Sequence, residues 1–394
     1  MLEPAETPAP AVAIAGCGAI TAVGHDVDSL RSAFRSNASG LRASAKFDSP
    51  RFKSSIVGAA PQGDAESDDP AFQLANAAML EARGQAREIL SPIPPARLGL
   101  VLSTTKANIE ALERLADGRP CSEPARRHLQ GDFLAADLAH AHGAHGPVQY
   151  VSVACISGLV AIQQGVKLIQ RDAADAVLVV GVDHLSAFVV AGFTALKAID
   201  PNGCRPFDRD RCGLSPGEAG AAIVLVRADR APLSAILVRG WGGSNDANHL
   251  TGPSRDGSGL AQAIRRAMDS AGLRPEQIDY VNAHGTGTAY NDAMESFALR
   301  TVFQDRCPPV SCSKGMLGHT LGAAGVVETI LCVLAMQERL LPGTPRLSVA
   351  AENTPASLVH QPRSVTRLDH VLKLNSGFGG VNGALILSHG SIVQ

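Results

Sequence analysis

The chain has 394 residues, 45% of them hydrophobic and 18% charged, so it can bury a large core and is not globally disordered. Its 35 lysines and arginines against 37 aspartates and glutamates give a formal net charge of −2, which excludes a generally basic nucleic-acid-binding protein. No run of about 18 uncharged apolar residues is present, so we predict no membrane span. The eight cysteines are scattered without CxxC spacing, which favours a reduced, cytoplasmic protein.

The predicted elements alternate between buried strands and helices after a loose tail at residues 1–10. Strands are predicted at 11–15, 97–103, 148–153, 176–182, 219–226, 235–238, 278–281, 310–311, 370–374 and 384–387. Helices are predicted at 28–35, 71–90, 134–142, 156–169, 258–271, 292–303 and 323–337. This alternation predicts an α/β fold with mixed sheets covered on both faces. Residues 11–230 and 231–394 carry similar sets of elements, which indicates two duplicated halves.

Two motifs match known patterns only in part. Gly16-Cys17-Gly18 follows the first predicted strand, but Thr21 stands where a dinucleotide-binding loop has its third glycine. The segment 213–217 reads G-x-S-x-G, yet a charged loop precedes it and a strand-like run follows it. A nucleophile elbow needs a strand, a sharp turn and then a helix, so we interpret Ser215 as a turn residue.

Cys155 lies where a predicted strand, VQYVSVA, ends and a predicted helix begins. Unpaired backbone N–H groups and the helix dipole favour a thiolate at such a position. The same N–H groups can stabilise a developing oxyanion. A buried, inert thiol is the alternative for a single cysteine.

Two histidines lie in loops rich in glycine and threonine that follow predicted strands. His284 is part of NAHGTGT, and His319 is part of SKGMLGHT. Each alone could be a structural histidine, but together with Cys155 they indicate a site at the carboxyl edge of a sheet. The segment 375–383, NSGFGGVNG, lets a ligand approach the backbone closely, unless it is an ordinary glycine-rich hairpin.

Taken together, ACISG, NAHGTGT, SKGMLGHTLGAAG and GFGGVNG resemble the β-ketoacyl-acyl carrier protein synthases, condensing enzymes of the thiolase superfamily. The resemblance is to the elongating type with a Cys-His-His site. It spans roughly residues 11–390, and the weaker matches CRPFDRDRCGLSPGEAG and NDANHLTGPS lie in the right order between the four motifs. It implies a thiolase-like, five-layered αβαβα fold built from two halves, the first with the nucleophile (11–230) and the second with the histidines (231–394).

The resemblance also implies roles for individual residues. Cys155 would accept the acyl group, and His284 and His319 would serve decarboxylation of a malonyl group on acyl carrier protein. Lys314 and Glu328 match a charged pair that supports the second histidine. The product would be a 3-oxoacyl-acyl carrier protein in fatty acid, polyketide or aryl polyene synthesis.

Further roles follow from the same resemblance. Thr286 and Thr288 would hold the phosphopantetheine arm, which arrives on the carrier protein, so no metal or other cofactor is expected. The backbone N–H groups of Cys155 and Phe378 would form an oxyanion hole. Gly377 and Gly379, in the same glycine-rich segment as Phe378, are counted with the substrate-binding residues.

Two departures from the family pattern concern the acyl pocket. Elongating members commonly have a Phe gate two places before the phenylalanine of GFGG, where this chain has Ser376. Lys106 and Asn108 fall where the family lines the pocket bottom at the dimer interface, although both side chains could instead point to solvent. These features, with ACISG, resemble synthases of aryl polyenes or related polyketides.

Partner predictions follow from charge and from the resemblance. Carrier proteins are acidic, so a basic rim is expected, formed by Arg205, Arg209 and Arg211 or by Arg126 and Arg127, unless these are solvated loop charges. A homodimer is expected, and a heterodimer with a chain-length-factor-like subunit is the alternative. The chain itself could be such a catalytically weak subunit, but those generally lack the nucleophile.

Overall fold

The computed structural model describes residues 9–61, 67–355 and 357–390, so the expected tail at 1–10 falls almost entirely outside the described part. Within this part, ten strands form one mixed sheet in the order β10-β9-β13-β14-β8-β1-β7-β6-β4-β5. The first half of the chain supplies β1 (Val12–Thr21), β4 (Leu98–Ser103), β5 (Val148–Val151), β6 (Ala176–Asp183) and β7 (Ala219–Arg227). The second half supplies β8 (Ile236–Asn245), β9 (Tyr280–Asn282), β10 (Val310–Ser311), β13 (His370–Gly377) and β14 (Val381–His389).

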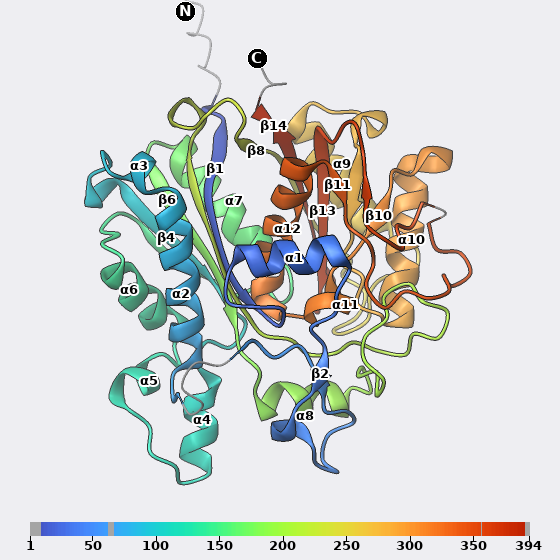
Figure 1. Cartoon of the computed structure of the whole chain (residues 1–394), viewed down its shortest axis with the longest axis horizontal. Helices are drawn as coiled ribbons and strands as arrows, with labels where there is room; N and C mark the ends of the chain where they lie inside the picture. The colour runs from blue at the N-terminus through green and yellow to red at the C-terminus, as the bar shows by residue number, and fades with distance from the viewer. Residues whose placement is uncertain (1–8, 62–66, 356, 391–394) are drawn as a thin grey trace, which may run out of the picture.

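These two sets of strands meet through a short antiparallel pair between β1 and β8, at Val12–Ile14. Helices cover both sets and also fill the space between them (Figure 1). The principal helices are α2 (Pro70–Gln85), α6 (Gly131–Ala141), α7 (Ser157–Gln170), α9 (Ser258–Ala271), α10 (Ala289–Phe303) and α12 (Ala324–Glu338).

The order of these layers is αβαβα. Helix α2 packs on β1, β7 and β6, and α6 packs on β4 and β5. On the other face of the same strands, α7 and α12 contact each other, and α12 also contacts β13 of the second set. Helix α9 covers β8 and β14, with α10 beside it. The predicted five-layered α/β fold is therefore confirmed, and the ten strands fall five on each side of residue 230.

The shorter elements surround this frame. They are α1 (Val27–Ser36), α3 (Arg87–Leu90), α4 (Ile109–Ala116), α5 (Glu123–Arg127), α8 (Ala187–Ala195), α11 (Lys314–Leu317), β2 (Arg42–Ala43), β3 (Ile56–Val57), β11 (Leu340–Leu341) and β12 (Arg363–Ser364). Figure 1 shows α4, α5, α8 and β2 gathered at one end of the molecule, at the carboxyl ends of the parallel strands β4 and β6.

Helix α12 is the centre of the core. Within the described residues, one helical stretch, Leu321–Glu338, has the length and mean hydropathy (1.5) of a membrane span, but 89% of it is buried inside the protein. Apart from Glu328 and Thr329, the buried side chains of α12 are apolar, and the helix lies in the middle layer, where strands β6 and β7 of the first set and β13 and β14 of the second set cover it.

Glycines explain where the predicted boundaries and motifs differ from the structure. Gly16 and Gly18 lie inside β1, where an added Cβ would come within 2.3 Å of the Ala82 carbonyl oxygen and 2.0 Å of the Ala78 carbonyl oxygen of α2. These glycines let α2 pack directly on β1. Because they lie inside the strand, they do not form a nucleotide-binding loop. Strand β8 continues to Asn245 through a Gly-Trp-Gly-Gly run, well past the predicted end at residue 238, because pairing with β14 extends along it.

Candidate active site

Cys155 lies in a sharp turn between β5 and α7. The preceding residue, Ala154, has φ +45°, a left-handed conformation that costs energy for any residue other than glycine. The start of α7 also touches the start of α12, because an added Cβ on Gly158 would meet the backbone nitrogen of Val326 at 2.7 Å. The loop before α12 carries His319, so this close crossing brings His319 toward Cys155.

The structure brings together the three residues that the sequence analysis singled out. His319 Nε2 lies 3.0 Å from Cys155 Sγ. The rings of His284 and His319 have centroids 5.2 Å apart at an interplanar angle of 82°. All three side chains are buried. They come from positions far apart in the chain and form one compact group at the carboxyl ends of β5 and β9.

The hydrogen-bond partners fix which nitrogen of each imidazole carries the proton. His284 Nδ1 lies 2.9 Å from the Asn375 amide nitrogen and 3.1 Å from Lys314 Nζ, which are both donors. His319 Nδ1 accepts a long hydrogen bond, 3.4 Å, from the backbone N–H of Leu321. Each Nδ1 is therefore an acceptor, which favours the tautomer with the proton on Nε2, and both side chains line the cavity described below.

Burial and nearby cations keep both imidazoles neutral. Burial, followed by the charge of Lys314, lowers the pKa of His319 to about 3. The same two causes hold the pKa of His284 well below its ordinary value of 6.5. The reactive atoms of the three residues lie within 4.8 Å of one another, a spacing that a metal ion could bridge. With their protons on Nε2, both rings are hydrogen-bond donors toward this space.

The expectation of a thiolate at Cys155 is wrong for the resting protein. Burial raises the pKa of this thiol to about 12, and the opposing effects of Lys314 and of a hydrogen bond from the Phe378 backbone N–H are smaller. Cys155 also precedes the first residue of α7, Ser157, by two positions. The loss of water around the sulfur outweighs these favourable effects, and the resting thiol is protonated.

A buried ion cluster supports His284 from behind. Glu328 accepts from Lys314 Nζ at 2.7 Å and from Lys373 Nζ at 2.9 Å. Burial alone would raise the pKa of Glu328, but Lys314 and Lys373 outweigh it and hold that pKa at about 2. The predicted pair of Lys314 and Glu328 is thus present in the structure, but Lys314 Nζ hydrogen-bonds His284, at Nδ1 and at the carbonyl oxygen, and not the second histidine, as the resemblance implied.

The sequence analysis missed two members of this cluster, Lys373 and Asn375. Both lie on β13, and the Asn375 amide donates to Glu328 Oε2 at 3.0 Å as well as to His284. Alternating residues of a strand share a face, so these two side chains face α12 together with Val371. A lysine inside the strand expected at 370–374, followed two positions later by an asparagine, was the available signal.

Two more carboxylates, also missed, hold the loop that carries His284. Glu295 accepts the backbone N–H groups of His284 and Gly285, each at 2.6 Å. Asp292 accepts the backbone N–H of Gly287 at 3.2 Å. Burial raises the pKa of Glu295 to about 7. Their spacing of three residues on α10, directly after the loop, was the sequence signal.

A cavity of about 460 Å³ opens onto the three reactive side chains. Besides these, its lining includes Thr286, Thr288, Ser376, Gly377, Phe378, Phe193 and His249. The two threonine hydroxyls lie 2.7 Å apart, and the rings of Phe193 and Phe378 have centroids 6.0 Å apart. Gly379 does not line the cavity. It lies in the hairpin turn between β13 and β14, and its backbone N–H donates to the carbonyl of Leu250 in the loop after β8.

Ser376 is held by hydrogen bonds within the protein. Its hydroxyl donates to Asn382 Oδ1 at 2.7 Å, and the Asn382 amide donates to Asp246 Oδ1 at 2.7 Å. This chain ties β13 and β14 to the loop after β8. The position therefore offers the cavity a small, internally bonded side chain.

Lys106 and Asn108 do not point to solvent, and neither lines the cavity around Cys155. Asn108 is fully buried, and its amide donates to the carbonyls of Asp68 at 2.9 Å and Ala125 at 3.0 Å. Lys106 Nζ forms a buried ion pair with Asp183 Oδ1 at 3.0 Å. In the single chain, the Asn108 side chain joins two loops, and its expected place at the pocket bottom of a dimer stays a prediction.

The arginines expected at the cavity rim differ in solvent exposure and in ion pairing. Arg205 and Arg211 are mostly buried and bind the carboxylates of Asp200 and Asp292, respectively, each at 3.4 Å. The expectation of an accessible basic cluster is therefore wrong for these two. Arg209 keeps 64% of its side chain exposed.

The second candidate patch lies on α5. Arg126 and Arg127 are both exposed there. The guanidinium of Arg127 lies over the Phe133 ring, 4.9 Å from its centroid, and 3.8 Å from Asp137 Oδ1. Neither arginine lines the catalytic cavity.

A duplicated, five-layered fold with a thiol and two neutral imidazoles at its centre defines an acyl-transferring enzyme of the thiolase-like class. Comparison with known proteins places the chain within that class. Residues 9–231 match the family model "Beta-ketoacyl synthase, N-terminal domain", and residues 236–348 match "Beta-ketoacyl synthase, C-terminal domain". The chain belongs to the β-ketoacyl synthase family.

Individual relatives agree with this assignment. The chain is 32% identical to 3-oxoacyl-[acyl-carrier-protein] synthase 2 of Vibrio cholerae, covering 95% of this chain and 98% of the relative. Its structure is similar to the ishigamide ketosynthase/chain length factor, with a TM-score of 0.88, 29% identity and coverage of 96% and 99%. It is also similar to a ketosynthase in complex with its chain length factor from Xenorhabdus doucetiae, with a TM-score of 0.85, 28% identity and coverage of 96% and 98%.

Proposed function

We propose that this chain catalyses a decarboxylative Claisen condensation between an acyl group held on Cys155 and a malonyl group held on acyl carrier protein. The observation that carries the proposal is the convergence of Cys155 with two imidazoles that each direct Nε2–H into one cavity. A thiol can hold an acyl group, and two neutral N–H donors can stabilise an enolate oxygen without a metal.

The first step transfers the acyl group. Cys155 Sγ attacks the carbonyl carbon of the acyl thioester on acyl carrier protein and forms a new C–S bond. The bond from that carbon to the phosphopantetheine sulfur breaks, and the carrier leaves. Because the thiol is protonated at rest, its proton passes to the departing phosphopantetheine sulfur, and no net charge is created. The backbone N–H groups of Cys155 and Phe378 stabilise the oxyanion of this step; the hydrogen bond from Phe378 to the sulfur supports this role.

The second step forms the carbon–carbon bond. Malonyl carrier protein loses CO₂, and the electron pair of the broken bond becomes an enolate whose oxygen accepts Nε2–H from His284 and His319. The enolate carbon attacks the acyl-cysteine carbonyl, and the Cys155 thiolate leaves. It recovers a proton from solvent, and the product is a 3-oxoacyl-acyl carrier protein.

Hydrogen bonds from the protein prepare His284 as a donor. Lys314 and Asn375 hold Nδ1 of His284, so its Nε2–H is directed at the enolate before the reaction begins. We propose that Thr286 and Thr288 contact the phosphopantetheine arm along the cavity, and that no metal or resident cofactor takes part.

Partners are proposed from the relatives and from the fold. The name of the Vibrio relative supports acyl carrier protein, and Arg209 is the exposed loop arginine available to contact it. The two related ketosynthases bind a chain length factor, which supports a heterodimer as well as the expected homodimer. Strand β5 is the last strand of the sheet, where a second subunit could pair. We place the enzyme in the cytoplasm and in fatty acid, polyketide or aryl polyene synthesis.

A variant that separates the two steps tests the proposal. Cys155→Gln cannot carry an acyl group, so it should release CO₂ from malonyl carrier protein without forming a condensed product. Wild type, supplied with acyl-loaded carrier protein and malonyl carrier protein, should form a product two carbons longer than the acyl group, detected by mass spectrometry. Condensation by Cys155→Gln would contradict the role of the thiol. A complete loss of CO₂ release in this variant would contradict the role of the histidines.

A further inference from the structure

The segment that carries His319, between α11 and α12, bends sharply two residues after the histidine. Leu321 has φ +51°, a left-handed conformation that a residue with a side chain keeps only where the surrounding structure imposes it. The backbone N–H of Leu321 is the donor that His319 Nδ1 accepts, at 3.4 Å. The strained backbone therefore aims a donor at one nitrogen of a catalytic imidazole.

This donor decides what the other nitrogen of His319 can do. Nε2 lies 3.0 Å from Cys155 Sγ. While Nδ1 accepts from Leu321, Nε2 carries the proton and can donate to an enolate oxygen. Without that donor the proton would be free to move to Nδ1, and Nε2 would then accept from the Cys155 thiol. At 3.4 Å the hydrogen bond to Nδ1 is already long, so a small shift of Leu321 would break it.

The backbone of His319 itself is held by other contacts. Its N–H donates to the carbonyl of Ser215 at 2.8 Å, and its carbonyl accepts from the N–H of Gly217 at 2.9 Å. These two hydrogen bonds fix the histidine but do not reach Leu321. The left-handed conformation of Leu321 therefore needs a separate support.

That support acts on the next residue, Gly322, which is bound on both sides at the carboxyl ends of β4 and β6. Its N–H donates to Asp183 Oδ2 at 2.7 Å, and its carbonyl accepts from Ser103 Oγ at 3.1 Å. An added Cβ on Gly322 would come within 2.9 Å of Asp183 Oδ2, so the contact is tight. Because the N–H of Gly322 belongs to the peptide group that joins it to Leu321, the bond to Asp183 holds Leu321 as well.

Asp183 is itself held rigidly. It is fully buried at the last position of β6, and its carboxylate accepts from the hydroxyls of Thr104 and Thr105, each at 2.8 Å. The backbone N–H of Thr105 also donates to it, at 3.2 Å from Oδ1 and 3.1 Å from Oδ2. A carboxylate with this many donors cannot turn away from Gly322 without losing several hydrogen bonds.

Lys106 balances the charge of Asp183. Its Nζ lies 3.0 Å from Asp183 Oδ1. The carboxylate is close enough to the catalytic thiol to add to the effect of burial, which raises the pKa of Cys155. An unpaired carboxylate at this place would also oppose the negative charge of an enolate. Paired with Lys106, Asp183 supplies an acceptor for Gly322 without a net negative charge.

We propose that Asp183, together with Ser103, is a positioning residue for His319. The two side chains hold Gly322, and Gly322 holds Leu321, whose N–H keeps the proton of His319 on Nε2. This inference rests on the proposed function and extends it, because it gives the buried network at the ends of β4 and β6 a part in the decarboxylation step.

Two double variants separate the hydrogen bond to Gly322 from the charge of Asp183. Lys106→Met/Asp183→Asn and Lys106→Met/Asp183→Leu both remove the ion pair, but only asparagine keeps an oxygen that can accept the Gly322 N–H. The leucine variant should release CO₂ from malonyl carrier protein about 10- to 100-fold more slowly than the asparagine variant. The KM for malonyl carrier protein should be the same in both, because the threonines proposed to contact the phosphopantetheine arm lie on another loop.

The protonation of His319 gives a readout that a merely structural role would not change. In NMR spectra of protein isotope-labelled at the histidine nitrogens, Nδ1 of His319 should be unprotonated in wild type and partly protonated in the leucine variant. Asp279→Asn is the matched control, because this carboxylate also accepts two backbone N–H groups, at 2.7 and 2.9 Å, but at the amino end of β9. It should leave both the rate and the His319 signals unchanged.

Ser103→Ala is a smaller change that keeps the test decisive if the leucine variant does not fold. It should slow CO₂ release by at least about threefold and produce some protonated Nδ1 in His319. Equal rates in the asparagine and leucine variants, wild-type behaviour of Ser103→Ala, or a loss of rate without a change in the protonation of His319 would overturn the proposal. A wild type that releases no CO₂ would instead contradict the proposed function itself.

Discussion

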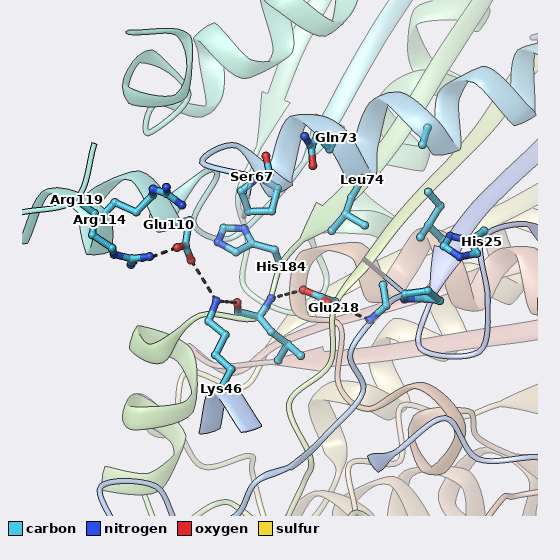
Figure 2. Close-up of a pocket in the computed structure, with 16 residues that line it drawn as sticks. His25, Lys46, Ser67, Gln73, Leu74, Glu110, Arg114, Arg119, His184 and Glu218 are labelled. Carbon is cyan, nitrogen blue, oxygen red and sulfur yellow. Dashed lines mark hydrogen bonds and ion pairs between the residues drawn. The ribbon is translucent and has the colours of Figure 1, made fainter. Parts of the chain in front are cut away.

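Two cavities of the protein differ in how their buried imidazoles are partnered. In the catalytic cavity, His284 and His319 each have Nδ1 bound by donors from the protein, which leaves one directed N–H for chemistry. In the cavity of about 520 Å³ beside the amino-terminal part of α2, His184 has no partner on either nitrogen among the described residues (Figure 2). The difference indicates that the catalytic site holds its N–H donors in place before the reaction begins, whereas hydrogen bonds do not orient the ring of His184.

The largest expected effect comes from breaking the prepared site. His284→Ala and His319→Ala should each lower the rate of CO₂ release from malonyl carrier protein by about 10²–10³-fold, the usual cost of one oxyanion-stabilising donor. Release of labelled CO₂ measures this directly. The exposed His360→Ala variant is the matched control and should keep the wild-type rate. A change of less than about threefold in both active-site variants would show that the imidazoles do not stabilise the enolate.

The neutral state of the two imidazoles predicts how the rate of CO₂ release depends on pH. Because the pKa of His319 is about 3 and that of His284 lies well below 6.5, neither ring gains a proton as the pH falls from 8 through 6.5. The rate of CO₂ release should therefore show no step near pH 6.5. A loss of activity with a midpoint near that value, absent from a His360→Ala control, would contradict the buried, neutral state of the two rings.

Removal of Glu328 should have the next largest effect, on stability. Glu328→Gln leaves Lys314 and Lys373 buried without their counter-ion, so we expect a loss of about 3–5 kcal/mol in the free energy of unfolding. The wild-type advantage over this variant should be full above pH 4.5 and should disappear as the pH falls toward 2, because the folded-state pKa is about 2 against an ordinary 4.5. Urea unfolding at several pH values measures both; an advantage that grows on acidification is the contrary result.

Asn108 lines neither cavity, so the variant Asn108→Ala should change stability and not the chemistry. The loss of two hydrogen bonds to loop carbonyls should lower the free energy of unfolding by about 1–3 kcal/mol. Thermal unfolding measures this loss. A stability equal to wild type, combined with a changed acyl-chain preference, would restore Asn108 to the acyl pocket.

The smallest effect concerns encounter with the carrier protein. Arg209→Glu should raise the apparent KM for acyl carrier protein by several-fold and leave kcat nearly unchanged, because an exposed charge acts mainly on association. Arg274→Glu serves as the control on the other half of the chain. An equal rise in KM for a free pantetheine thioester would show that Arg209 acts inside the cavity.

Much of the frame could be predicted because it depends on local patterns. Continuous apolar runs such as residues 176–182 and 219–226 have one interpretation, a strand buried on both faces, and the structure contains both. Residues 258–271, which have clear amphipathic spacing, form α9 over the predicted range. Boundaries were missed where glycine or pairing partners decide them, as in β8 and β13.

The site was only partly predictable for a different reason. Sequence motifs identify Cys155, His284 and His319, but protonation depends on burial and on distant charges. The thiolate expectation failed because Cys155 is buried beside neutral rings, and no local pattern reports that. Lys373 and Asn375 were missed because their role requires α12 to cross β13, a contact between segments far apart in sequence.

Intact-protein mass spectrometry tests the central claim most directly, after the enzyme is exposed once to acyl carrier protein that is loaded with an acyl group. Wild type should gain the mass of one acyl group, located on the peptide that contains Cys155, and should lose it when malonyl carrier protein is added, with release of a product two carbons longer. An acyl group found on another residue, such as the exposed Cys212, or product formed without any adduct, would contradict the account.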